Sequence, residues 1–104
     1  MKKQIKEAVG ALCAAERVAL ACHVNPDGDA LGCILALTHV LRALGKEAIP
    51  LSADGVPDIY RWMPGAEWVE TDTARRDFDL AVVCDSGALD RVGRRILPVI
   101  EAAP

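Results

Sequence analysis

One histidine and three aspartates are the residues of this sequence that could do chemistry together. His23, Asp27 and Asp29 lie in the segment HVNPDGDALG at 23–32, and Asp85 lies far downstream. Three carboxylates that lie close together repel one another, and divalent cations remove that repulsion. An imidazole with several carboxylates suits Mn²⁺, with Mg²⁺, Co²⁺ or Fe²⁺ as alternatives, and lacks the thiolates of structural zinc sites. The four side chains therefore predict a site for divalent metal ions.

Pro26 and Gly28 suit the loop that carries two of these carboxylates. Pro26 stiffens a turn, and Gly28 lets it tighten so that Asp27 and Asp29 approach different sides of a metal pair. The same Pro-Asp-Gly-Asp sequence is also typical of an ordinary turn, in which Asp29 only caps the next helix. Both interpretations stay open from the turn itself. The histidine at the end of an apolar run and the remote third aspartate favour the metal site.

Other candidate residues carry weaker signals. His39 lies on the more polar side of a predicted helix, as is typical of a surface histidine. Ser86 lacks the two flanking glycines of a nucleophile elbow. Gly28 and Gly32 match neither the dinucleotide-binding fingerprint nor a phosphate-binding P-loop.

Apolar patterning predicts an α/β domain with a mainly parallel sheet. Helical spacing alternates along the chain with short, continuous apolar runs, which are typical of strands buried on both faces. The expected helices span 2–15, 30–44 and 90–102, the last bent at Pro98, and the expected strands span 18–22, 47–51 and 79–85, with a minor strand at 67–70 and a helical turn at 59–63. Ligands bind beyond the carboxyl ends of parallel strands. His23 and Asp85 therefore face one crevice if their strands are neighbours.

Composition narrows the class of protein. The length of 104 residues allows at most one small domain. The hydrophobic fraction of 52 % is ordinary for a folded domain. A net charge of −3 argues against long nucleic acid as a partner, because binding many phosphates requires clustered Lys and Arg. No uncharged apolar run reaches the roughly 20 residues of a membrane span, so no membrane partner is expected. Four cysteines without a Cys-x-x-Cys pair, and no signal peptide, predict a cytoplasmic protein with buried thiols.

Segment 23–32 resembles the first motif of the DHH phosphoesterases, a superfamily named after a later Asp-His-His motif. Segment 82–87 (VVCDSG) is similar to the second motif, in which an aspartate ends a buried strand. Segments 56–65 and 90–93 resemble the bacterial branch that degrades nanoRNA and dephosphorylates 3′-phosphoadenosine 5′-phosphate. The resemblance implies a Rossmann-like α/β domain with helices on both faces of a mainly parallel sheet.

The same resemblance implies a mechanism that uses two metal ions. His23 and Asp27 would bind one ion, Asp29 would bind the other, and Asp85 would bridge both. A bridging water or hydroxide would attack phosphorus in line, and the two cations would stabilise the developing negative charge. The substrates would be short RNAs or 3′-phosphoadenosine 5′-phosphate, which also fit the acidic balance of the chain.

Residues 1–104 would then be the amino-terminal portion of a DHH domain. The Asp-His-His motif, the fourth-motif aspartate and the C-terminal substrate-binding domain of that family do not occur among them. We therefore expect the intact protein to be a phosphoesterase and the 104-residue chain alone to be inactive. The nearly all-apolar helix at 30–44 also predicts association into homodimers or larger species. The alternatives are a non-catalytic metal- or nucleotide-binding regulatory module, and a scaffold domain whose turn matches by chance.

Overall fold

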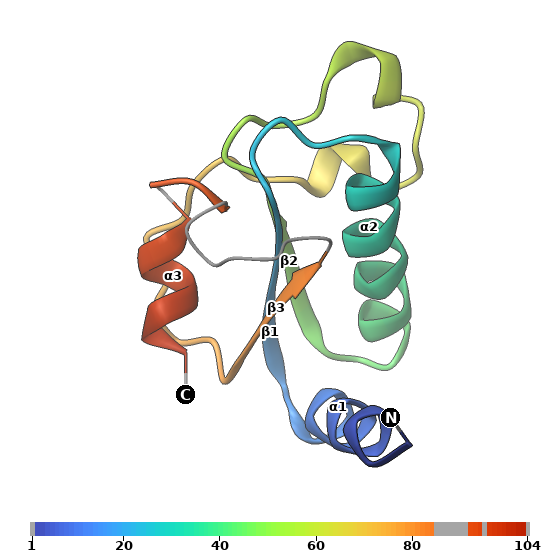
Figure 1. Ribbon diagram of the computed structural model, residues 1–104, viewed down its shortest axis with the longest axis vertical. Coiled ribbons are helices and arrows are strands. Elements are labelled where there is room, and N and C mark those ends of the chain that lie inside the picture. The colour runs from blue at the N-terminus through green and yellow to red at the C-terminus, as the bar shows by residue number, and fades with distance from the viewer. Residues whose placement is uncertain (1, 85–91, 95, 104) are drawn as a thin grey trace.

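A three-stranded parallel sheet with helices on both of its faces forms the fold (Figure 1). The structure is a computed structural model that describes residues 2–84, 92–94 and 96–103. Its elements, in chain order, are α1 (Lys2–Ala14), β1 (Arg17–Cys22), α2 (Gly28–Ala43), β2 (Glu47–Leu51), the single-turn 3-10 helices η1 (Asp58–Tyr60) and η2 (Ala66–Trp68), β3 (Leu80–Cys84) and α3 (Leu97–Ala102). The predicted α/β class with a mainly parallel sheet is confirmed.

Strand β1 lies in the middle of the sheet, in the order β2-β1-β3, and pairs in parallel with both neighbours. In the register of the ladder, Val18 lies opposite Ala48 of β2 and Leu80 of β3. The carboxyl ends of all three strands therefore lie at one edge of the sheet. The two apolar runs that precede His23 and Asp85 are neighbouring strands, which is the condition that the sequence analysis set for a shared crevice.

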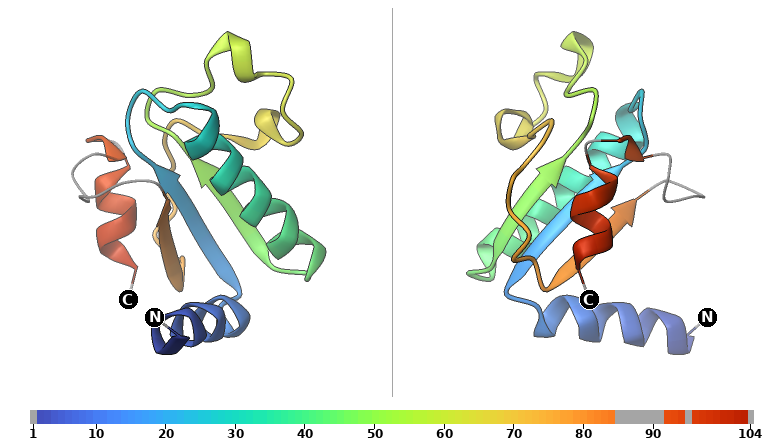
Figure 2. Two further views of the ribbon diagram at one scale, coloured as in Figure 1. Left: turned by 45° about the vertical axis from the view of Figure 1, so that its right-hand side comes forward. Right: turned by 90° about the vertical axis from the view of Figure 1, so that its left-hand side faces the viewer.

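Two apolar layers explain why β1 is hydrophobic at successive positions. Side chains alternate between the two faces of a strand. One set packs under α2, and the other packs under α3; the left view of Figure 2 shows these two helices on opposite sides of the sheet. The α2 layer contains Val18, Leu20, Cys22, Leu31 and Ile34, and the α3 layer contains Ala19, Ala21, Leu51, Val99 and Ile100.

Strand β3 is less buried than its apolar sequence predicted. Leu80, Ala81, Val82 and Val83 are only half-buried, and Cys84 is the one buried residue of the strand. Within the described residues, β3 has a neighbouring strand on one side alone, which is the side of β1. A continuous apolar run therefore did not guarantee burial on every side.

Three further predictions from the pattern are wrong in detail. Pro98 lies in the first turn of α3, where its missing N–H leaves no hydrogen bond unmade, so it begins a short helix instead of bending a long one. Segment 67–70 is mostly a 3-10 turn with a single bridge between Leu51 and Glu70. Cys13 and Cys33 are exposed, whereas Cys22 and Cys84 are buried as predicted.

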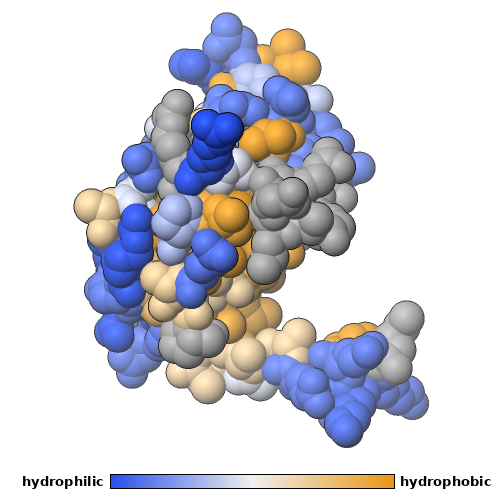
Figure 3. All heavy atoms as spheres, turned by 60° about the vertical axis from the view of Figure 1, so that its left-hand side comes forward, coloured by the Kyte–Doolittle hydropathy of each residue, from blue (hydrophilic) through white to orange (hydrophobic). Residues whose placement is uncertain are grey.

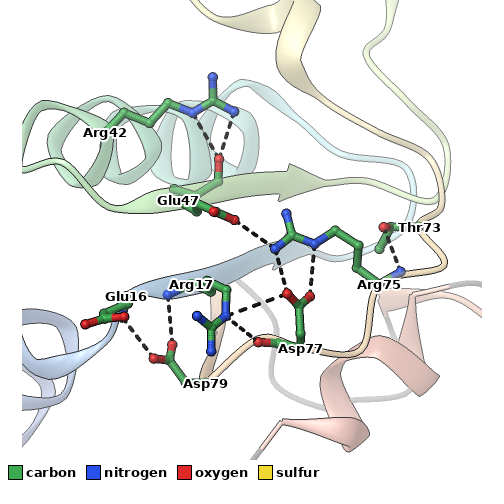
Figure 4. A network of polar contacts seen from close by, with 9 residues as sticks. Glu16, Arg17, Arg42, Glu47, Thr73, Arg75, Asp77 and Asp79 are labelled. Carbon is green, nitrogen blue, oxygen red and sulfur yellow. Dashed lines mark hydrogen bonds and ion pairs between the residues drawn. The ribbon is translucent and has the colours of Figure 1, made fainter.

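Charged side chains tie the amino-terminal edge of the sheet together (Figure 4). Arg75 donates to both carboxylate oxygens of Asp77, at 2.9 and 3.0 Å, and to Glu47 at the start of β2, at 2.8 Å. Arg17, at the start of β1, donates through Nε to the Asp77 carbonyl at 2.8 Å. The neighbouring carboxylates raise the pKa of Arg75. This network lies at the amino ends of the strands, opposite the edge that carries His23.

Candidate metal centre

His23 directly follows the last residue of β1 and is half-buried. Its Nδ1 lies 2.6 Å from the carbonyl oxygen of Val24. Because a carbonyl oxygen only accepts, Nδ1 must donate, and the neutral ring then carries its lone pair on Nε2. Metal-binding histidines commonly use this arrangement, in which one ring nitrogen donates to a backbone carbonyl and the other is the ligand.

Asp27 caps the amino end of α2. Its backbone is extended (φ −98°, ψ −177°), and its Oδ1 accepts a hydrogen bond from the Ala30 N–H at 2.8 Å. The alternative prediction that Asp29 caps this helix is therefore wrong, because Gly28 and Asp29 already belong to the helix. One carboxylate oxygen of Asp27 is engaged in the cap, and the second remains available to a cation.

Asp29 lies in the first turn of α2 and is exposed. Asp27 precedes the helix and Asp29 belongs to it, and both side chains are exposed. The ligand roles themselves stay predictions.

The tight turn that precedes α2 is made by Asn25 instead of Gly28. Asn25 is the non-glycine residue with a left-handed backbone among the described residues (φ 52°), a conformation that asparagine tolerates well. Gly28 is required for a different reason. A Cβ there would lie 3.3 Å from Cε1 of Tyr60, so the missing side chain makes room for the aromatic ring of η1.

Asp85, the fourth predicted ligand, lies outside the described residues. The residue before it, Cys84, pairs with Cys22, which precedes His23. Among the described residues, no group of three or more His, Cys, Asp or Glu side chains is close enough to hold a metal ion. The structure thus places His23, Asp27 and Asp29 on one segment at the carboxyl edge of the sheet, and the complete four-residue set stays a prediction.

The donors that are described fit a divalent metal ion in their chemistry. An imidazole with its lone pair on Nε2 and two accessible carboxylates offer nitrogen and oxygen atoms, which suit Mn²⁺ and related cations. The buried thiols belong to Cys22 and Cys84, which are the last residues of β1 and β3. The sequence predicts that the ligands are the nitrogen and oxygen donors that follow the strands.

Asp54 is a residue of this edge that the sequence analysis missed. It lies in the loop after β2, and its Oδ2 accepts a hydrogen bond from the Asn25 N–H at 2.6 Å. The signal that could have identified it is the Asp54-Gly55 turn directly after a parallel strand, because that turn must lie at the same edge as His23.

His39 is a surface histidine, as predicted. Its side chain is exposed, its Nε2 lies 2.9 Å from the Pro64 carbonyl oxygen, and its ring centroid lies 4.8 Å from that of Trp68. These contacts hold the loop that carries η1 and η2 against α2.

In the described part of the chain, no helix is long and apolar enough to cross a membrane.

Comparison with known proteins gives similarities in sequence and in structure. No family model matches the sequence. The chain is 37 % identical over 67 residues, 53 % of this chain, to the bifunctional oligoribonuclease and PAP phosphatase NrnA of Thermus thermophilus, and covers 21 % of that protein. Its fold matches the crystal structure of an exopolyphosphatase-related protein from Bacteroides fragilis with a TM-score of 0.87 and 26 % identity, over 100 % of this chain and 33 % of that one. The chain thus spans about a fifth of the curated relative and a third of the solved structure.

Proposed function

We propose that this chain is the amino-terminal part of a DHH-type phosphoesterase that uses divalent metal ions to hydrolyse short oligoribonucleotides or 3′-phosphoadenosine 5′-phosphate. The observation that carries the proposal is the pairing of β1 with β3, which brings the residues preceding His23 and Asp85 side by side. The similarity to a relative named as an oligoribonuclease and phosphatase supports the same class of reaction.

The strand order supports the position of the site. From β1 the chain crosses through α2 to β2 on one side, and β3 pairs on the other side of β1. The strand order therefore switches direction between β1 and β3, and ligands of parallel sheets bind in the crevice beyond such a switch point. His23 and the amino end of α2 lie at this edge.

The contacts of His23 and Asp27 support the roles proposed for these two residues. His23 would offer Nε2 to one ion, in a tautomer fixed by the Val24 carbonyl, and Asp27 would hold the same ion with its carboxylate while its cap bond fixes the side chain. Asp29 would serve the second ion, and Asp85 would lie between the two. Bound divalent ions supply an activated water nucleophile and neutralise charge that develops at phosphorus.

The choice of substrate rests on the relatives and on charge. The curated relative, to which 53 % of this chain aligns at 37 % identity, is named as an oligoribonuclease and PAP phosphatase. The acidic balance of the chain, with a net charge of −3, also favours a small substrate over a long polyanion.

A hydrolysis assay of the intact protein tests this proposal. We expect Mn²⁺-dependent release of mononucleotides from a dinucleotide RNA and of phosphate from 3′-phosphoadenosine 5′-phosphate, with less release from polyphosphate. Asp29→Asn should abolish the release, whereas Glu101→Gln, which removes an exposed carboxylate of α3, should not. Binding of Mn²⁺ without turnover of any substrate would instead support a non-catalytic regulatory module.

A further inference from the structure

One peptide group connects the carboxylate of Asp54 with the imidazole of His23. The N–H of Asn25 donates to Oδ2 of Asp54 at 2.6 Å, and the carbonyl oxygen of Val24 accepts from Nδ1 of His23 at 2.6 Å. These two groups belong to the same peptide unit. In a trans peptide they point in opposite directions, so the unit is held from both sides.

The loop that presents Asp54 is itself closed by hydrogen bonds. Ser52 is buried, and its Oγ donates to the Gly55 carbonyl at 2.9 Å while the Gly55 N–H donates to the Ser52 carbonyl at 3.0 Å. The Ser52 N–H donates to the Glu70 carbonyl, also at 3.0 Å. Asp54 therefore sits in a turn of defined shape next to β2, in which its carboxylate has a fixed direction.

A close contact packs this turn against the loop after β1. A Cβ on Gly93 would lie 2.7 Å from Cβ of Ala53 and 3.1 Å from Cγ1 of Val24. The backbone at Gly93 thus lies against both loops. Ala53 precedes Asp54 in the chain, and Val24 supplies the carbonyl oxygen that accepts from His23. The three segments leave little freedom for the Val24–Asn25 peptide to rotate.

A carboxylate on one side of a peptide unit strengthens the hydrogen bond on its other side. The negative charge polarises the N–H, which increases the negative partial charge of the carbonyl oxygen, as in other chains of hydrogen bonds. The Val24 oxygen then accepts more strongly from Nδ1–H of His23 and stabilises the tautomer with its lone pair on Nε2. In many metal sites a carboxylate accepts directly from the second ring nitrogen of a histidine ligand, and here a peptide unit would stand between the two groups.

We propose that Asp54 is a positioning residue of the metal centre, which acts through the Val24–Asn25 peptide to hold His23 as a metal ligand. The hydrogen bond also compensates for the left-handed backbone of Asn25. The part of this proposal that concerns metal rests on the proposed function, whereas the part that concerns the tautomer of His23 does not.

Nuclear magnetic resonance of the ring nitrogens tests the tautomer directly. His39 is the second of two histidines, so a His39→Gln variant assigns the signals. At alkaline pH, we expect the ¹⁵N shifts of a ring protonated at Nδ1 in the wild type. Asp54→Ala should shift the population towards protonated Nε2. Asp54→Asn keeps an acceptor but loses the charge and should give a smaller shift in the same direction.

Titration calorimetry with Mn²⁺ tests the consequence for the metal. Loss of an outer partner of a ligand typically costs about tenfold to a hundredfold in metal affinity, and we expect a loss in this range for Asp54→Ala and a smaller loss for Asp54→Asn. Asp58→Ala is the matched control, because it removes an exposed carboxylate that pairs with Arg61 on the neighbouring turn. The control should leave both the ring shifts and the affinity unchanged.

The outcomes separate this inference from the proposed function. Unchanged ring shifts and unchanged affinity in Asp54→Ala would overturn the role of Asp54. If that variant does not fold, unchanged values in Asp54→Asn would do so. A wild type that binds no Mn²⁺, with a tautomer that still responds to Asp54, would overturn the metal site and retain the link between Asp54 and His23.

Discussion

Cys22 and Cys84 lie opposite each other as the last paired residues of β1 and β3. The next residue along the chain is His23 in one case and Asp85 in the other. Parallel pairing makes both strands end at the same edge of the sheet, and the predicted site requires the Asp85 carboxylate to lie near His23 there. The test of the whole site therefore begins with Asp85.

If the proposed phosphohydrolase activity is correct, Asp85→Asn should reduce turnover by the intact protein by at least about two orders of magnitude, comparable with the loss of one preorganised stabiliser of a transition state. The amide nearly preserves shape but removes the charge that would lie between two cations. Folding should persist, because one member of a crowded carboxylate set is neutralised. Steady-state kinetics and thermal unfolding measure the two effects. Turnover near the wild-type value would contradict the two-metal interpretation.

Asp27 should reveal separate contributions to helix stability and to metal binding. Asp27→Ala removes the cap bond to the Ala30 N–H and should lower the free energy of unfolding by about 1 kcal/mol. Asp27→Ser replaces one good cap with another, so stability should be retained while Mn²⁺ binding is lost. Urea denaturation and calorimetry measure the pair. Retention of Mn²⁺ affinity by the serine variant would show that Asp27 is only a cap.

Asp79 should make the fold sensitive to acid. Its carboxylate accepts from the N–H groups of Glu16 at 2.9 Å and of Arg17 at 3.0 Å, and these bonds hold the pKa of Asp79 below its usual value. A lowered folded-state pKa gives stability that is fully present above the unfolded value of about 3.9 and is lost as the pH falls through the folded value.

Denaturant unfolding as a function of pH measures this effect. Asp79→Asn should be less stable at neutral pH, because an amide has one acceptor oxygen for two N–H groups, and its stability should vary less with pH in the acidic range. Asp72→Asn is the control, since Asp72 accepts only from the neighbouring Thr73 N–H. An equally steep acid dependence in Asp79→Asn and the wild type would refute the assignment.

Gly93→Ala and Gly10→Ala should have opposite effects on stability. Gly93 has a left-handed backbone (φ 97°), and its new Cβ would lie 2.7 Å from Cβ of Ala53, so we expect a loss of about 1–3 kcal/mol in the free energy of unfolding. Gly10 lies within α1 with nothing near the added Cβ, so alanine should stabilise that helix by up to about 1 kcal/mol. Equal effects in chemical denaturation would mean that the contact at Gly93 is not formed.

The apolar side of α1 should mediate association of the chain. No residue of α1 is buried, and Ile5 and Val9 are 55 % and 52 % exposed. Figure 3 shows α1 projecting from the rest of the molecule. A groove of about 170 Å³ between α1 and α2 is lined by apolar residues that include Val9, Leu12, Val40 and Leu44.

Sedimentation velocity over a range of concentrations tests this association. Exposed apolar patches favour contact with other apolar surfaces, so Val9→Glu should shift the chain towards monomer. Trp62→Ser is the matched control, because Trp62 is 75 % exposed but lies in the turn after η1. A wild type that stays monomeric at high concentration, or an equal effect of the control, would disprove a specific role for the α1 face.

Apolar patterning was sufficient to predict β1, β2 and β3, the parallel α/β architecture and the positions at which polar residues follow apolar runs. This was feasible because burial of a central parallel strand on both faces requires apolar side chains at successive positions, as in residues 18–22. The same local signal was misleading for β3, because its burial depends on a neighbour along the sheet and not on its own residues.

Contacts between distant segments select the residues that support the candidate site, and local sequence does not encode them. Asp27 and Asp29 have equal preferences for a helix cap, and the path of the loop after β1 selected Asp27 by giving it an extended backbone. Asp54 meets Asn25 across 29 positions of sequence, and no local pattern encodes the direction of that carboxylate. Contacts between loops depend on how strands pair, so the link from Asp54 to His23 emerges only when β1 and β2 lie side by side.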